Sequence, residues 1–178
     1  MEMELSDVER AERDGLIASI HDAFAGVTRG ERGISWSECI AIDDHAPDDV
    51  CAAARQSEQD SQWSQLVDDQ NWQPFSGCGG FSFINAEGFR YYLPPTMIRF
   101  LRGDNTEGYP GLLIRVIERF TDGHLRPLWS EAQLRSIACF IAFMARHDDQ
   151  TLWLPGDLNP WTEALEGQWG RYLPHASP

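Results

Sequence analysis

At the middle of the chain stands Gly88-Phe89-Arg90-Tyr91-Tyr92-Leu93-Pro94-Pro95, its densest run of apolar and aromatic residues. Residues 85–88 are predicted to form a turn, because asparagine is common at the start of turns and glycine tolerates positive φ. Phe89, Tyr91 and Leu93 then alternate with two more polar residues, which is the two-residue period of a half-buried strand. Because proline cannot donate a hydrogen bond to a sheet, the strand is expected to end at Pro94 and a helix to run from Pro95 to Gly103. The stretch thus predicts a minor β element around residues 81–93, joined to a helix.

Helices are expected on both sides of this central motif. Capping boxes, in which a serine and a glutamate or glutamine three residues later exchange hydrogen bonds, begin at Ser6, Ser35 and Ser130. Prolines suited to a first helical turn stand at 47 and 160. The expected helices cover residues 6–26, 35–42, 47–56, 110–120, 130–147 and 159–169. With no internal repeat and no long linker, the prediction is a single, mainly α, compact multi-helix domain over residues 1–178.

Within this domain, four regions are distinguished by composition and pattern. They are an acid-rich helical region at 34–73, the central strand-helix motif at 85–103, a core helix at 130–147 and a C-terminal helix at 159–169. The helix at 130–147 has the widest apolar stripe, so we expect it to be central to the core.

Length and composition indicate a folded protein in the cytoplasm. A chain of 178 residues buries about 70% of its unfolded surface, and 42% of the residues are apolar, which excludes a disordered protein. Apolar runs stay well short of the ~18–20 residues of a membrane span. The first four residues, Met1-Glu2-Met3-Glu4, include two acids and no base, unlike the basic start of a signal peptide. A cytoplasmic location is therefore expected.

Charge is the strongest compositional signal. The chain has 28 acidic and 14 basic residues, a net charge of −14, and every basic residue is arginine. Without lysine, Schiff-base and P-loop mechanisms are excluded. So negative a protein is unsuited to nucleic acid or anionic lipid, both of which require cationic contacts. It suits a basic protein partner, although high solubility alone is an alternative explanation.

The acidic residues concentrate between residues 38 and 69. This segment holds nine acids and only Arg55 as a base, a net charge of −8. Solvation and helix capping explain part of this excess. The functional interpretation is an acidic surface carrying aromatic anchors, which docks on a basic partner. Its predicted partner-binding residues are Trp36, Asp43, Asp44, Asp48, Asp49, Glu58, Asp60 and Trp63.

The sequence gives little support for a metal site, another cofactor site or a catalytic cysteine. The calcium-loop register is absent around Asp43 and Asp44, and the four cysteines lack zinc-ligand spacing, so neither a metal nor another cofactor is expected. Cys78 lies among glycines and could be an exposed nucleophile, but no histidine lies within thirty residues of it. Arg90 and Tyr92, on the outward face of the predicted strand, could belong to a site, although pairing within the fold is favoured.

The central motif also resembles the signature of an uncharacterised bacterial family, a domain of unknown function. The resemblance rests on residues 81–94 and Met97, on Ile34-Ser35-Trp36 with Asp43 and Asp44, and on the helix containing Phe140 and Met144. It covers about residues 20–147 and implies no known activity. In its charge and lack of catalytic motifs, the chain is also similar in type to the immunity proteins that neutralise bacterial toxins.

Two classes of function follow. The first is a protein-binding module without enzymatic activity, an immunity protein that binds and neutralises a basic bacterial toxin such as a nuclease. It would be a monomer or a small homo-oligomer. The alternative is an enzyme of unrecognised type that uses Cys78, or a regulatory interaction protein.

Overall fold

The chain is seen here as a computed structural model that describes residues 4–58, 61–74, 80–104, 113, 117, 128–147 and 159–174. Its α-helices are α1 (Asp7–Ala23), α2 (Trp36–Asp43), α3 (Asp48–Ser57), α4 (Ala86–Arg102), α6 (Glu131–His147) and α7 (Pro160–Ala164). Shorter helical turns are η1 (Trp63–Val67), η2 (Gly80–Ser82), η5 (Leu165–Trp169) and η6 (Gly170–Tyr172). The mainly helical single domain predicted from the sequence is confirmed.

Outside the central motif, the helices capped by Ser6, Ser35, Ser130 and Asn159 begin where the sequence predicts. The side chain of Ser6 accepts a hydrogen bond from the Glu9 amide, and the Glu9 carboxylate accepts one from the Ser6 amide. Reciprocal bonds join Ser130 and Gln133 in the same way, and Asn159 caps α7. The helix predicted over 110–120 lies outside the described residues except at positions 113 and 117, which are helical.

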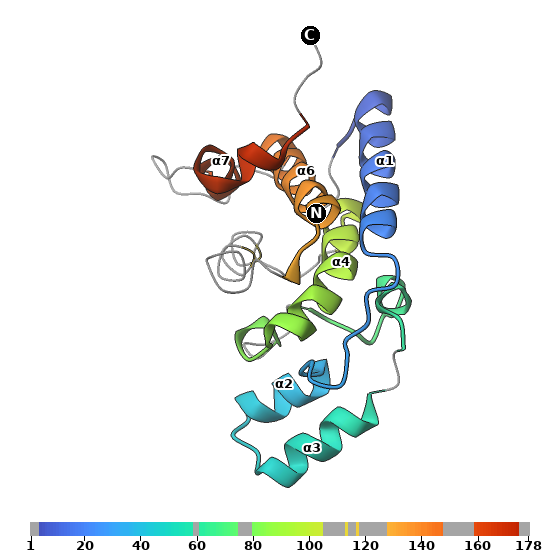
Figure 1. Ribbon diagram of the computed structural model, residues 1–178. Helices are drawn as coiled ribbons and strands as arrows, with labels where there is room; N and C mark the ends of the chain where they lie inside the picture. Colours follow the sequence, from blue (N-terminus) through green and yellow to red (C-terminus); the bar gives the residue numbers. More distant parts are fainter. Residues whose placement is uncertain are drawn as a thin grey trace.

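Three helices form one end of the molecule. Helix α6 lies between α1 on one side and α7 on the other (Figure 1). Leu16 and Ile20 of α1 and most of α6 are buried, and Arg146 of α6 forms an ion pair with Glu12 of α1. The stripe on α6 is therefore central to the core, as its width predicts.

The central motif is not a strand. Residues 86–102 form one helix, α4, and no strand occurs among the described residues, so the minor β element predicted around 81–93 is wrong where the structure describes it. Thirteen of the 17 residues of α4 are buried. A helix buried on every side has no polar face, so its 3.6-residue period cannot be recognised. The alternation of Phe89, Tyr91 and Leu93 is then a coincidence of composition.

Packing also explains why α4 passes through Pro94 and Pro95. Each proline in a helix interior removes a backbone hydrogen bond and costs about 3 kcal/mol. Full burial of each large apolar side chain returns about 1.5–3 kcal/mol, and eight such side chains are buried on this helix. The Asn85 side chain caps the first turn by accepting from the Gly88 amide, and the Thr96 hydroxyl donates to the carbonyl of Tyr92. Tertiary burial therefore outweighs the local preference of the prolines.

The C-terminal half of α4 holds the segment around η1. Arg99 is buried and donates to the carbonyl oxygens of Asp69 and Trp72, while its guanidinium lies 5.8 Å from the Trp72 ring centroid. Arg102 forms an ion pair with Asp68 at 2.7 Å. These bonds attach residues 68–72 to the central helix.

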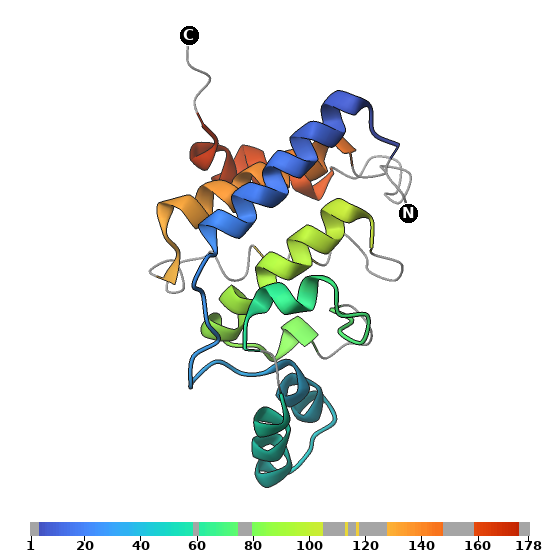
Figure 2. The same ribbon diagram turned by 90° about the vertical axis from the view of Figure 1, so that its right-hand side faces the viewer.

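Helices α2 and α3 pack against each other and project from the opposite end of the molecule, as both views show (Figures 1 and 2). Helix α3 has no buried residue. Among the described residues, no helix has both the length and the apolar character needed to cross a bilayer.

Candidate partner-binding site

The α2–α3 hairpin, residues 36–58, is built on a network of charged hydrogen bonds at its base. Ser35 and Glu38 form the predicted capping box of α2. The buried Glu38 carboxylate also accepts from Arg55 of α3, at 2.7 Å from Nε and 2.6 Å from Nη2, and these bonds raise the pKa of Arg55. Glu58, just after α3, accepts from the Ser37 amide at 3.0 Å. Because a carboxylate is favourable at a helix N-terminus, Glu58 stabilises the start of α2.

The other end of the hairpin is a tight turn. The amide of His45 donates to Ile42 and that of Ala46 donates to Ala41, at 3.0 and 2.9 Å. This is the Schellman pattern that ends many helices, and glycine usually occupies its left-handed position. Here His45 occupies it, with φ of 55°. The turn reverses the chain within a few residues, so the end of α2 and the start of α3 lie next to each other.

Four aspartates gather at this turn. Asp43 and Asp44 end α2, and Asp48 and Asp49 begin α3. Asp43 is half-buried and the other three are exposed. Within the part of the chain that the structure describes, none of the four forms an ion pair. We name these four residues the acidic turn.

Apolar side chains are exposed on the same hairpin. Ile40 of α2 and Val50 of α3 are each 47% exposed. The hairpin as a whole carries six acids and a single arginine, a net charge of −5, and that arginine is already bound to Glu38. The hairpin thus combines negative charge that its single arginine does not neutralise with two exposed apolar side chains.

The structure separates the eight residues predicted from the sequence. The four aspartates of the acidic turn come together, whereas Glu58 lies at the base of the hairpin and serves the fold. Trp36 and Trp63 are 6% and 5% exposed, so they belong to the core and are not the surface anchors that the sequence interpretation made them. Asp60 lies outside the described residues.

Ile40 and Val50 were missed by sequence reasoning. Each follows the apolar pattern of a short helix, and nothing local distinguishes an apolar residue that packs on the core from one that faces solvent. The available signal was the shortness of both helices, since a helix of 8 or 10 residues covers its neighbours only partly.

Two of the described cysteines, Cys39 and Cys139, have thiols whose pKa is raised, whereas a reactive thiol needs a lowered pKa. Cys39 is fully buried. Burial, with the carboxylates of Glu38 and Glu58 nearby, raises the pKa of its thiol to about 12. Burial also raises the pKa of Cys139. The nucleophile predicted as an alternative, Cys78, lies outside the described residues.

Cys39 leads to a prediction for alkaline pH. Below about pH 8.5 the thiol is protonated in both folded and unfolded chains and adds no pH dependence. Above that pH the unfolded chain ionises while the folded protein keeps the proton, so the free energy of unfolding falls by up to about 1.4 kcal/mol per pH unit. Between pH 8 and pH 10, the free energy of unfolding should therefore fall by about 2 kcal/mol more in the wild type than in Cys39→Ala, which has no thiol at this position. Urea denaturation at both pH values measures this difference, and equal losses would contradict the prediction.

Comparison with known proteins assigns most of the chain to one family. The profile of a family described as "Family of unknown function (DUF6714)" matches residues 12–169. The chain belongs to this family. The match includes all of α4 and the α2–α3 hairpin, so the resemblance inferred from the central motif is confirmed at the level of the family. No curated protein and no solved structure shows significant similarity to this DUF6714 member.

Proposed function

We propose that this DUF6714 protein is an acidic protein-binding module, an immunity protein that binds and neutralises a basic bacterial toxin such as a nuclease. The observation that carries the proposal is the acidic turn: four aspartates at the end of a projecting hairpin, with no ion pair among the described residues. A cytoplasmic protein of this kind would block the toxin before it reaches its substrate.

Helix electrostatics separate these aspartates into two kinds. Asp48 and Asp49 lie in the first turn of α3, where negative charge is favourable. Asp43 and Asp44 lie at the end of α2, where it is unfavourable by about 0.3–1 kcal/mol each, and the last turn of α2 contains no basic residue. Helix stability therefore does not explain why aspartate occupies positions 43 and 44. Binding of a cationic surface would explain it.

The two components of the surface have different roles. Exposed carboxylates attract a basic partner over about 8–10 Å at physiological salt and accelerate association. Ile40 and Val50 become desolvated in the complex and slow dissociation. A nuclease cleft that binds phosphates offers the matching cationic surface.

The test begins with identification of the toxin. The tagged protein is used to retain partners from its native host, with washes at low and high salt, and each retained basic protein is purified. Binding is then measured with the acidic turn reversed by Asp43→Arg, Asp44→Arg, Asp48→Arg and Asp49→Arg. We expect the association rate at low salt to fall by about 100-fold and the toxin to remain active in the presence of this variant.

A second quadruple variant controls for total charge. Asp22, Asp104, Glu163 and Glu166 are exposed and lie in α1, just after α4 and in the C-terminal helical turns, outside the hairpin. Changing all four to arginine gives the same net charge of −6. This control should bind and neutralise the toxin nearly as the wild type does. Equal effects of the two variants would assign the charge to solubility and remove the acidic turn from the function.

A further inference from the structure

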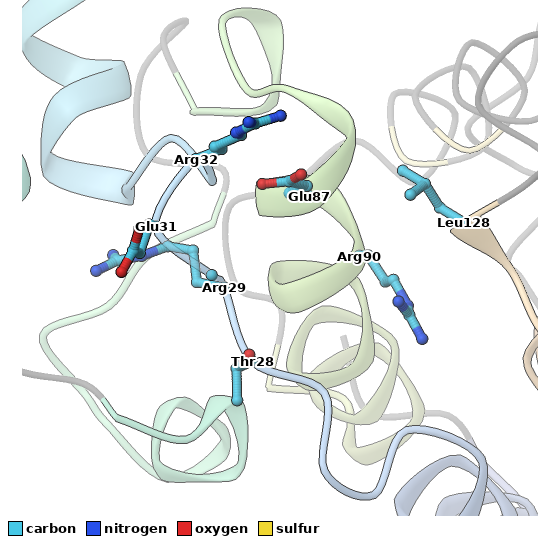
Figure 3. Close-up of a pocket in the computed structure, with 8 residues that line it drawn as sticks. Thr28, Arg29, Glu31, Arg32, Glu87, Arg90 and Leu128 are labelled. Atoms are coloured by element: carbon cyan, nitrogen blue, oxygen red, sulfur yellow. The ribbon is translucent and has the colours of Figure 1, made fainter.

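A second surface of opposite character lies beside the central motif. A cavity of about 450 Å³ separates the loop after α1 from the first turns of α4 (Figure 3). Its charged lining residues are Arg29, Arg32, Arg90, Glu31 and Glu87. Three arginines against two glutamates give this lining a net charge of +1, in a chain whose net charge is −14.

We propose that this cavity binds a small molecule in which a carboxylate or phosphate group stands next to a hydrogen-bond donor, with Arg32 and Arg90 holding the anion. The site is independent of the acidic turn and of the function proposed for it. The inference rests on the rigidity of the walls, on the unsatisfied donor of Arg90 and on the charges around it.

Hydrogen bonds and close contacts between the loop after α1 and the start of α4 fix the walls of the cavity. The Asn85 side chain accepts from the Ile34 amide at 3.0 Å and donates to the Arg32 carbonyl at 2.7 Å, so the loop is bonded to the cap of α4. A Cβ at Gly33 would lie 2.2 Å from the Arg29 carbonyl oxygen, and one at Gly88 would lie 2.6 Å from that of Ile34. The cavity is therefore preformed, which lowers the entropic cost of binding.

Arg90 supplies the donor that points to an anion. Its Nε is buried and has no hydrogen-bond partner, and no ion pair involving Arg90 or Arg32 occurs among the described residues. Figure 3 shows the Arg90 side chain leaving α4 on the side of Leu128, and Arg32 extending from the loop above Glu87. A buried charged donor without an acceptor is unfavourable. An anion bound in the cavity would compensate the charge of this guanidinium.

The neighbouring residues define the ligand more closely. Arg29 donates to the Tyr92 hydroxyl at 3.0 Å and so has a role in the fold. Guanidinium groups bind carboxylates and phosphates through paired hydrogen bonds. Glu87 lies close to Gly30 across the cavity, where its carboxylate disfavours a highly charged anion and accepts from an ammonium or hydroxyl group. This combination selects an anion with an adjacent donor.

NMR of the arginine side chains tests the proposal directly. The Nε–Hε signal of Arg90 is assigned by its loss in Arg90→Gln, and the intact protein is titrated with L-serine, phosphoethanolamine and L-serinamide. We expect saturable shifts of this signal with L-serine, with phosphoethanolamine or with both, since each carries an anion beside an ammonium group, and none with L-serinamide, which lacks the carboxylate. Shifts with one anion only identify that anion as the preferred group.

Two variants and a control connect the shifts to the cavity. Arg32→Gln and Arg90→Gln should each weaken binding of the active probe by tenfold or more, measured by amide shifts around Asn85. Arg135→Gln, on the exposed face of α6, should leave it unchanged, as should reversal of the acidic turn. The proposal is overturned if no probe shifts the Arg90 signal, or if both cavity variants bind as the wild type does.

Discussion

Replacing Gly88 by alanine is expected to lower the free energy of unfolding by about 3 kcal/mol, although the position is inside a helix. On propensity alone, alanine would be better than glycine by about 1 kcal/mol. The added Cβ, however, would lie 2.6 Å from the Ile34 carbonyl oxygen and 2.8 Å from Cγ1 of Ile84. The first of these is backbone, held by Asn85, so relief requires the loop to move away from α4, and such overpacking costs about 1–3 kcal/mol or more.

Gly15 provides the matched control for this prediction. It lies in the interior of α1, and a Cβ there would meet no atom within 4 Å. Gly15→Ala should therefore stabilise the protein by about 0.5–1 kcal/mol. Urea denaturation of both variants gives the two values. If Gly88→Ala were also stabilising, the close contact between the loop and α4 would be refuted.

Gly88 also shows where sequence reasoning reached its limit. The capping boxes at residues 6, 35 and 130 were readable because a cap is made by residues within four positions of one another. The role of Gly88 depends on Ile34, more than fifty positions away. With that contact unseen, Asn85 and Gly88 resemble a turn, and the aromatic residues after them resemble a strand. The prolines strengthened that error, since the burial that outweighs them is tertiary.

The candidate site also contains residues that the sequence could group and residues whose exposure it could not predict. The aspartates of the acidic turn are close in sequence, so a tight turn is enough to bring them together, and their grouping was predictable. Whether an aromatic or aliphatic side chain faces solvent depends on which elements cover it. Composition alone made Trp36 and Trp63 resemble surface anchors, and it concealed the exposure of Ile40 and Val50.

Trp36→Ala measures the consequence of this correction. The Trp36 ring packs against Trp72, Phe81 and Tyr92, with centroids 5.4, 5.1 and 5.3 Å away, and its amide donates to the buried Tyr92 hydroxyl at 2.9 Å. Removing such a side chain from a core costs about 3–5 kcal/mol. We expect a loss of about 4 kcal/mol in urea denaturation, with the base of the hairpin loosened because α2 begins at this residue.

Ile40→Ala, one turn further along α2, should behave in the opposite way. Its side chain is half exposed, so the free energy of unfolding should change by less than about 0.5 kcal/mol, while the complex with the basic partner should dissociate faster. A surface anchor lowers affinity when it is truncated, and a core residue lowers stability. Wild-type stability in Trp36→Ala combined with weakened binding would restore Trp36 as an anchor and contradict the packing of Trp36 against α4.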